Sequence, residues 1–171
     1  HIKLKYRFYL HCFMKYRQLG STGLNVSEIG FGCWGIGGGA KIQRWSDNWK
    51  ADDKDSRRAL EKAAELGINF FDTALVYGDG HSERLVGELA KGNDIIIATK
   101  VPPMNGEWPA RLDVDIREVF PKEHIIKYAR QSRQNIGRKI DLLQLHVWTD
   151  KWVNSNEWLD SFRQLKNEGI A

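Results

Sequence analysis

One pattern recurs four times along the chain of 171 residues: a short apolar run, a loop, an amphipathic segment and a glycine. Each apolar run has the length of a strand, and residues 95–99 are almost continuously apolar, which is typical of a parallel strand buried on both faces. Four such units in succession predict an α/β fold with a parallel sheet and right-handed crossovers. The pattern fits either a doubly wound sheet or a barrel. The predicted strands are residues 29–33, 68–71, 95–99 and 140–145.

The amphipathic segments have apolar residues three and four positions apart, as core-facing helices do. We expect helices over residues 53–66, 82–90 and 121–136, with Pro121 in the first turn of the third. A fourth helix is expected from about Asn154, where Glu157 three residues later suggests a capping box. The residues predicted to face the core are Leu60, Ala63, Ala64, Leu85, Val86, Leu89, Ile125, Ala129, Ser132, Ile136, Trp158, Leu159, Phe162 and Leu165.

The amino-terminal part divides at Met14, the first plausible initiator. Residues 1–13 are predicted to be an upstream extension outside the fold, and residues 14–171 one folded unit. Within that unit, glycine turn chemistry at residues 20–23 lies between two short strand-like stretches, which predicts a β-hairpin before the first repeated unit.

Composition excludes several classes of protein. The net charge is +4, but positive residues cluster in the first 17 positions or alternate with acidic ones, so no nucleic-acid partner is expected. Cys12 and Cys33 form no CxxC pair and no metal-ligand pattern, so no metal site is expected. No apolar run approaches the roughly 20 residues of a membrane span. We therefore expect a protein of the cytoplasm without a membrane partner.

Polar residues follow three of the predicted strands where each strand ends. Asp72 follows the second strand, Lys100 the third and His146 the fourth, while Tyr77 lies in the loop five residues after Asp72. Neighbouring strands lie about 4.8 Å apart, so side chains at these carboxyl ends can converge on one pocket. The sequence therefore predicts one site that contains all four residues.

This set of side chains fits proton transfer to a carbonyl oxygen. A tyrosine hydroxyl has a pKa of about 10, and a nearby ammonium is expected to lower it. Tyr77 then acts as general acid, Lys100 lowers its pKa, Asp72 holds the lysine, and His146 orients the carbonyl by a hydrogen bond. Each residue alone has a structural explanation, such as a turn former or a surface lysine. Four compatible groups at matched positions favour function.

Several motifs in this order resemble those of the aldo-keto reductases. Residues 16–24 read YRQLGSTGL and residues 30–34 read GFGCW, which is similar to the opening of the family. Residues 67–78 read GINFFDTALVYG and look like its aspartate and tyrosine segment. Residues 98–101 (ATKV) and 141–146 (DLLQLH) resemble its lysine and histidine strands.

The resemblance implies a (β/α)8 barrel of the TIM type, of which this chain contains the first four strand-helix units. It also implies NADPH as hydride donor, a small-molecule carbonyl substrate, and Asp72, Tyr77, Lys100 and His146 as the catalytic tetrad. The implied cofactor-binding residues are Gly32, Cys33, Trp34 and Asp72, and those that contact the substrate are Trp34, Tyr77 and His146.

A complete barrel of this kind needs eight units and about 250 residues. In the family, most groups that grip the cofactor belong to later strands, so we expect this chain alone to bind NADPH weakly and to have little activity. Two open sheet edges also predict self-association. The segment from His146 to Asp150 is one residue longer than the family often has, and the long loops at residues 43–49 and 102–120 are expected to shape the pocket.

Three other interpretations are set against this one. The glycines at residues 35–39 follow a strand, but no helix opens at the third glycine, so a dinucleotide fingerprint is rejected. A barrel of the same family can also be a non-catalytic NADPH-binding regulatory or redox-sensing subunit. An unrelated sugar- or phosphate-binding α/β domain requires that the four site residues fail to converge.

Overall fold

The computed structural model describes residues 14–39 and 50–171. The extension predicted at residues 1–13 and the loop predicted at residues 43–49 lie outside the described residues. The elements follow one another as β1 (Tyr16–Gln18), β2 (Asn25–Ser27), β3 (Phe31–Gly32), α1 (Trp34–Gly37), α2 (Asp53–Glu65), β4 (Phe70–Asp72), α3 (His81–Leu89), β5 (Ile96–Val101), α4 (Ile116–Val119), α5 (Lys122–Ile136), β6 (Leu142–Leu145), the 3-10 helix η1 (Asp150–Trp152) and α6 (Asn156–Asn167).

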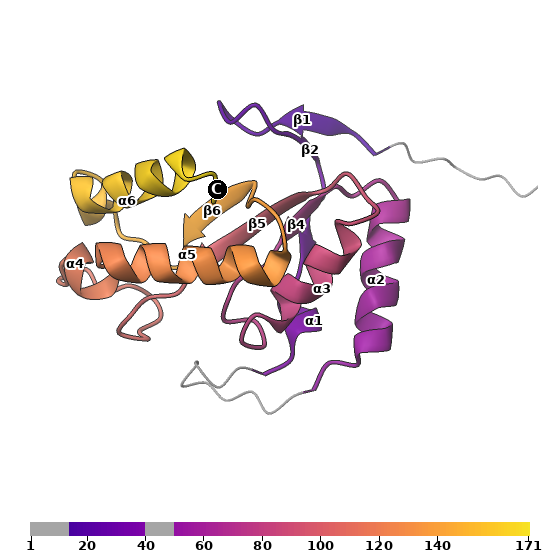
Figure 1. Ribbon diagram of the computed structural model, residues 1–171, viewed down its shortest axis with the longest axis horizontal. Coiled ribbons are helices and arrows are strands. Elements are labelled where there is room, and N and C mark those ends of the chain that lie inside the picture. The colour runs from indigo at the N-terminus through magenta and orange to yellow at the C-terminus, as the bar shows by residue number, and fades with distance from the viewer. Residues whose placement is uncertain (1–13, 40–49) are drawn as a thin grey trace, which may run out of the picture.

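The centre of the fold is a parallel sheet in the order β3-β4-β5-β6. In Figure 1, α3 and α5 lie in front of this sheet, with α2 and α6 on either side of them. Helix α3 packs against both α2 and α5, and α5 packs against α6. The predicted α/β class and the four successive strand-helix units with a parallel sheet are therefore confirmed.

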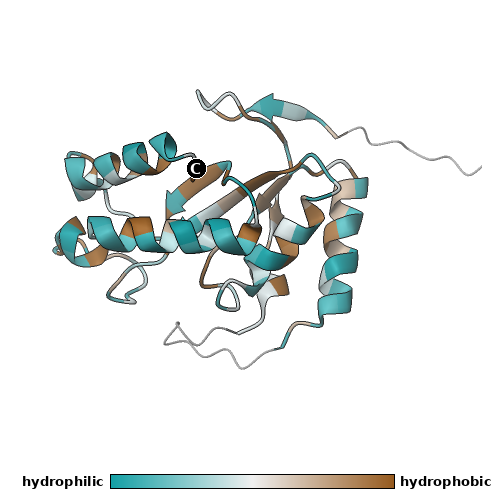
Figure 2. Ribbon diagram, viewed as in Figure 1, coloured by the Kyte–Doolittle hydropathy of each residue, from teal (hydrophilic) through white to brown (hydrophobic). Residues whose placement is uncertain are grey.

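Strand register determines which side chains face the helices. Phe71 and Ile97 are fully buried on the helix side of the sheet, where Leu85, Ile125 and Leu165 pack. In Figure 2 the strands of the parallel sheet are largely brown or pale, whereas α2, α5 and α6 are mostly teal. Side chains alternate along a strand, so the neighbours of Phe71 and Ile97 point to the opposite face. This opposite face carries the candidate site.

The amino-terminal hairpin is confirmed and is anchored to the residue before β4. Strands β1 and β2 pair antiparallel. The Ser27 backbone N–H donates to Asn69 Oδ1 at 2.7 Å, and Asn69 Nδ2 donates to the Asn25 carbonyl at 2.9 Å. The Tyr16 hydroxyl donates to the Gly67 carbonyl at 2.8 Å. The hairpin thus contacts the amino end of the sheet, opposite to the end that carries the site.

Several local expectations were wrong in detail. Helices α1 and α4 form in segments expected to be loops, each as a single short turn. The predicted capping box is absent because α6 begins after Ser155, whose side chain makes no capping hydrogen bond. Pro121 is the N-cap of α5, one position before the helix. Trp158, Leu159 and Phe162 are only partly buried, since α6 packs beside β6 at the edge of the sheet.

None of the helices in residues 14–39 and 50–171 is long and apolar enough to cross a membrane. Over the same residues, no group of three or more His, Cys, Asp and Glu side chains is placed to hold a metal ion.

We expect the 171-residue polypeptide, expressed by itself, to self-associate. In the described part of the chain, β3 and β6 each have a sheet neighbour on one side only. Trp148 is 40% exposed beside β6, and Trp158 and Phe162 line the same apolar groove. Open strand edges next to apolar surface favour association. Sedimentation velocity should give oligomers whose mass rises with concentration, and a clean monomer with two-state melting would contradict this expectation.

Candidate active site

The ammonium of Lys100 is held in place by contacts to two neighbouring residues. Lys100 lies in β5 and its side chain is 13% exposed, on the sheet face away from the helices. Its Nζ lies 2.8 Å from Asp72 Oδ1 and donates to the Thr73 carbonyl, also at 2.8 Å. Gln144 lies in β6, opposite Lys100 in the pairing with β5. Its Nε2 donates weakly to the same Asp72 oxygen at 3.5 Å. A carboxylate and a carbonyl therefore hold the lysine at the carboxyl end of the sheet.

Tyr77 is held above this ion pair by a tight turn between β4 and α3. Its ring centroid lies 5.2 Å from Lys100 Nζ. Two glycines allow the turn to contact α1: a Cβ at Gly37 would lie 2.8 Å from the Tyr77 carbonyl carbon and oxygen. Gly78 has a φ of +63°, and a Cβ there would overlap the Gly37 carbonyl oxygen. Larger residues at either position would push the turn away from α1.

His146 closes the site from the end of β6. Its backbone N–H donates to the Val101 carbonyl at 3.0 Å, which continues the pairing with β5. Its ring makes an edge contact with Tyr77 at a centroid distance of 5.6 Å and another with Trp108 at 4.3 Å. Burial, with a smaller effect from the Lys100 charge, lowers the pKa of His146 to about 3. The imidazole is therefore neutral at physiological pH and carries one N–H.

Burial controls the acidity of Tyr77. It raises the pKa of the phenol to about 12, and the negative charge of Asp72 and the neighbouring Cys33 act in the same direction. The expectation of a lowered pKa was wrong, because burial and the negative charge of Asp72 outweigh the effect of the Lys100 ammonium. Tyr77 thus retains its proton at neutral pH, as a proton donor must.

The residues predicted to bind cofactor differ in exposure. Gly32 is exposed and a Cβ built on it would meet no atom within 4 Å, and Trp34 is 51% exposed. Gly32 pairs with Asp72 across β3 and β4, so no side chain from position 32 fills the space beside that carboxylate. Cys33 is 0% exposed, and its thiol contacts the Phe31 carbonyl instead. Burial also raises the pKa of that thiol. Cofactor binding at Cys33 stays a prediction.

The structure therefore brings the four predicted site residues together and adds others. Trp108 and Gln144 contact the site, but the sequence analysis did not select them. Gln144 could have been found from the sequence, because side chains two positions apart on a strand share a face and Gln144 lies two positions before His146. The pairing of Gln144 with Lys100 puts it on the face of the site. Trp108 lies in an irregular loop, where no periodicity indicates the direction of a side chain.

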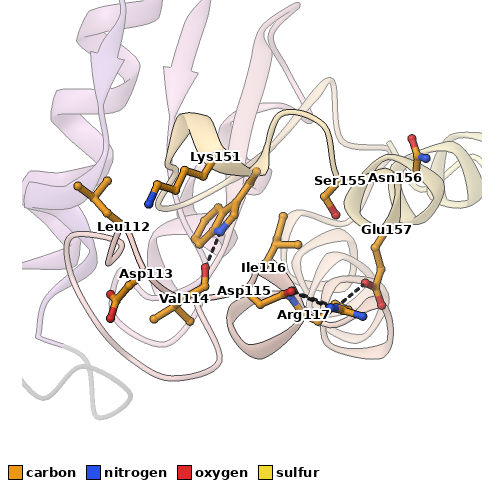
Figure 3. Close-up of a pocket in the computed structure, with 11 residues that line it drawn as sticks. Leu112, Asp113, Val114, Asp115, Ile116, Arg117, Lys151, Ser155, Asn156 and Glu157 are labelled. Atoms are coloured by element: carbon orange, nitrogen blue, oxygen red, sulfur yellow. Dashed lines mark hydrogen bonds and ion pairs between the residues drawn. The ribbon is translucent and has the colours of Figure 1, made fainter.

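A hollow with a volume of about 640 Å³ is shown in Figure 3, and none of the four site residues lines it. It is formed by residues 112–117 and by residues between 151 and 157. Trp152 is one of the lining residues, and its indole N–H donates to the Val114 carbonyl at 2.9 Å. Arg117 is paired with Asp115 at 2.7 Å and approaches Glu157 at 3.7 Å. Asp113 pairs instead with Arg111, outside the hollow, at 2.8 Å. Nothing in the hollow points to catalysis.

These features agree with comparisons to known proteins. The family model described as "Aldo/keto reductase family" matches residues 28–171, so the chain belongs to that family, and this supports an oxidoreductase role. An uncharacterized oxidoreductase of Bacillus subtilis, YqkF, is 31% identical over 92% of this chain and 46% of its own length. The aldo-keto reductase YhdN of the same organism is 30% identical over 91% and 44%.

A solved structure shows the same likeness. Aldo-keto reductase AKR11C1 from Bacillus halodurans, in its holo form, aligns with a TM-score of 0.68 and 36% identity over 92% of this chain and 48% of that one. The chain therefore spans about half the length of the relatives that it matches.

We expect the His146 imidazole to stay neutral from pH 8 to pH 5. The native pKa of about 3 lies below the ordinary value of 6.5, so the unfolded chain takes up this proton first. The stability present above pH 6.5 is then lost as the pH falls toward about 3. The ring signals of His146 in NMR spectra are identified by their absence in His146→Asn. These signals should not titrate over this range. A midpoint near 6.5 would show that the ring is not buried as described.

Proposed function

We propose that the protein reduces an aldehyde or ketone to an alcohol, with NADPH as hydride donor, as part of a complete (β/α)8 barrel. One observation carries the proposal: a fixed ammonium, a half-buried phenol and a neutral imidazole converge at the carboxyl end of a parallel sheet. Parallel α/β folds place their chemistry at this end. Relatives named versiconal hemiacetal acetate reductase and putative aryl-alcohol dehydrogenase are consistent with it.

Tyr77 is the proposed proton donor. As the carbonyl π bond breaks, negative charge develops on its oxygen, and the phenol Oη transfers its proton there to form the O–H bond. The neighbouring ammonium of Lys100 stabilises the phenolate that remains, and Asp72 keeps this lysine in place. His146, neutral and next to the Tyr77 ring, donates a hydrogen bond that orients the carbonyl. NADPH, when bound, supplies the hydride that forms the new C–H bond at carbon.

The open space beside Asp72 is the proposed nicotinamide position. Gly32 offers no side chain there, and the exposed Trp34 indole is suited to contact both the nicotinamide ring and the substrate. Tyr77 and His146 contact the substrate oxygen. We assign no contact to the Cys33 side chain, because it is fully buried.

Replacement of Tyr77 by Phe in the full-length protein should lower kcat at least 100-fold, because general acid catalysis contributes about 10² to 10⁴ in rate. NADPH oxidation would be followed by absorbance with a panel of aldehydes and ketones. Tyr128→Phe is the matched control, since Tyr128 lies in α5 and packs against His124 rather than the site.

Two outcomes would contradict this proposal. Turnover by wild type that is unchanged in Tyr77→Phe would remove the role of the phenol. Tight NADPH binding without turnover, together with a stable partner complex, would favour a regulatory subunit instead. Relatives named probable voltage-gated potassium channel subunit beta, one of them from Arabidopsis thaliana and 33% identical, make this the outcome to test.

A further inference from the structure

We propose that Ser82 and Glu83, in the first turn of α3, are positioning residues that hold the Tyr77 turn over Lys100. This inference rests on the proposed carbonyl reduction, because it says how that site keeps its geometry. Neither side chain faces the substrate. Both lie behind the sheet end, where they join the strands that carry the site to the helix that follows Tyr77.

Glu83 is a carboxylate with no exposed surface. Its Oε1 accepts a hydrogen bond from Thr99 Oγ1 at 2.6 Å, and its Oε2 accepts one from Asn135 Nδ2 at 2.7 Å. Thr99 directly precedes Lys100 in β5, whereas Asn135 lies in α5. Burial of a carboxyl group is unfavourable unless each oxygen is hydrogen-bonded, and here both are.

A purely structural role is a weak explanation for Glu83. Well-packed apolar residues usually stabilise a buried position as well as a buried charge does. A carboxylate adds hydrogen bonds of fixed direction, which apolar residues cannot make. Its two oxygens bond to β5 and to α5, so they fix the position of α3 relative to both elements. The result is that the helix after Tyr77 cannot slide along the strand that carries Lys100.

Ser82 makes the corresponding contacts to the other strands. Its Oγ accepts from Thr73 Oγ1 at 2.8 Å and donates to the Cys33 carbonyl at 2.9 Å. Thr73 follows β4 and its carbonyl accepts from Lys100 Nζ. Two adjacent residues of α3 therefore contact the carboxyl ends of β3, β4 and β5, all of which contribute to the candidate site.

The connection to Tyr77 is direct. The backbone N–H of Ser82 donates to the Tyr77 carbonyl at 3.2 Å, so the turn and the helix move together. Displacement of a reacting group by about 1 Å can cost 10²-fold in rate. Loss of the contacts made by Ser82 and Glu83 should therefore slow proton transfer although neither residue touches the substrate.

The test compares four variants of the full-length protein. Glu83→Ala removes both hydrogen bonds, and Thr99→Val, a milder change, removes only one. Glu83→Gln can keep both, because its amide N–H can donate to Thr99 Oγ1 while its oxygen accepts from Asn135. Glu88→Ala is the control, since Glu88 lies in the same helix with 47% of its side chain exposed and pairs with Arg57.

The kinetic readout is the pH profile of kcat, with NADPH affinity measured separately. We expect Glu83→Ala to lower kcat at least tenfold and Thr99→Val about fivefold, with the NADPH Kd within twofold of wild type. The alkaline limb of the profile should move to lower pH, because a displaced Tyr77 takes up water and loses part of the burial that raises its pKa. The groups that face it are Asp72, Lys100, His146 and Cys33, and none of them is changed.

A lower kcat with an unmoved pH profile, as simple loss of folded protein would give, would overturn the inference. Failure of Glu83→Gln to recover most of the rate would overturn it as well. Amide hydrogen exchange gives a readout that does not depend on activity. Residues 73–82 should exchange faster in Thr99→Val than in wild type or Glu88→Ala, and equal exchange would also overturn the inference. If wild type reduces no carbonyl, the proposed function fails, and exchange alone decides whether these contacts hold the turn.

Discussion

The ion pair between Lys100 and Asp72 is the interaction on which the site depends. It joins β5 to β4 at 2.8 Å, and the Thr73 carbonyl provides a second acceptor for the same ammonium. Most of the lysine side chain is buried, so removal of Asp72 would leave the ammonium without its carboxylate partner in a poorly hydrated place. The pair fixes a positive centre at the end of the sheet, and the phenol of Tyr77 and the imidazole of His146 are arranged around it.

The site combines a phenol that keeps its proton with a neighbouring ammonium that can stabilise the phenolate. Burial and the negative charge of Asp72 keep the phenol protonated. The same burial keeps His146 neutral, so its ring can donate a hydrogen bond without carrying charge. Such a site begins with its proton in place and needs the ammonium only when negative charge appears on the phenol oxygen.

The sequence was sufficient for the sheet and for the four residues at its carboxyl end, because strand ends follow directly from apolar runs and their breaks. Asp72, Lys100 and His146 were found in this way, and Tyr77 was found from its short distance along the chain. The predicted direction of the Tyr77 pKa shift was wrong, and the burial of Cys33 was not foreseen. Both depend on how α1 and α3 pack over the sheet. The sequence predicted no role for Trp108 or Glu83, because their roles come from tertiary contacts.

A double-mutant cycle on Asp72 and Lys100 tests the central claim most directly. It compares kcat of the full-length protein with that of Asp72→Asn, Lys100→Met and the variant that carries both changes. If the two groups act as one unit, the double variant is about as slow as the slower single variant, because the second change has no pair left to break. Effects that multiply, as for independent residues, would contradict an ion pair that organises the site.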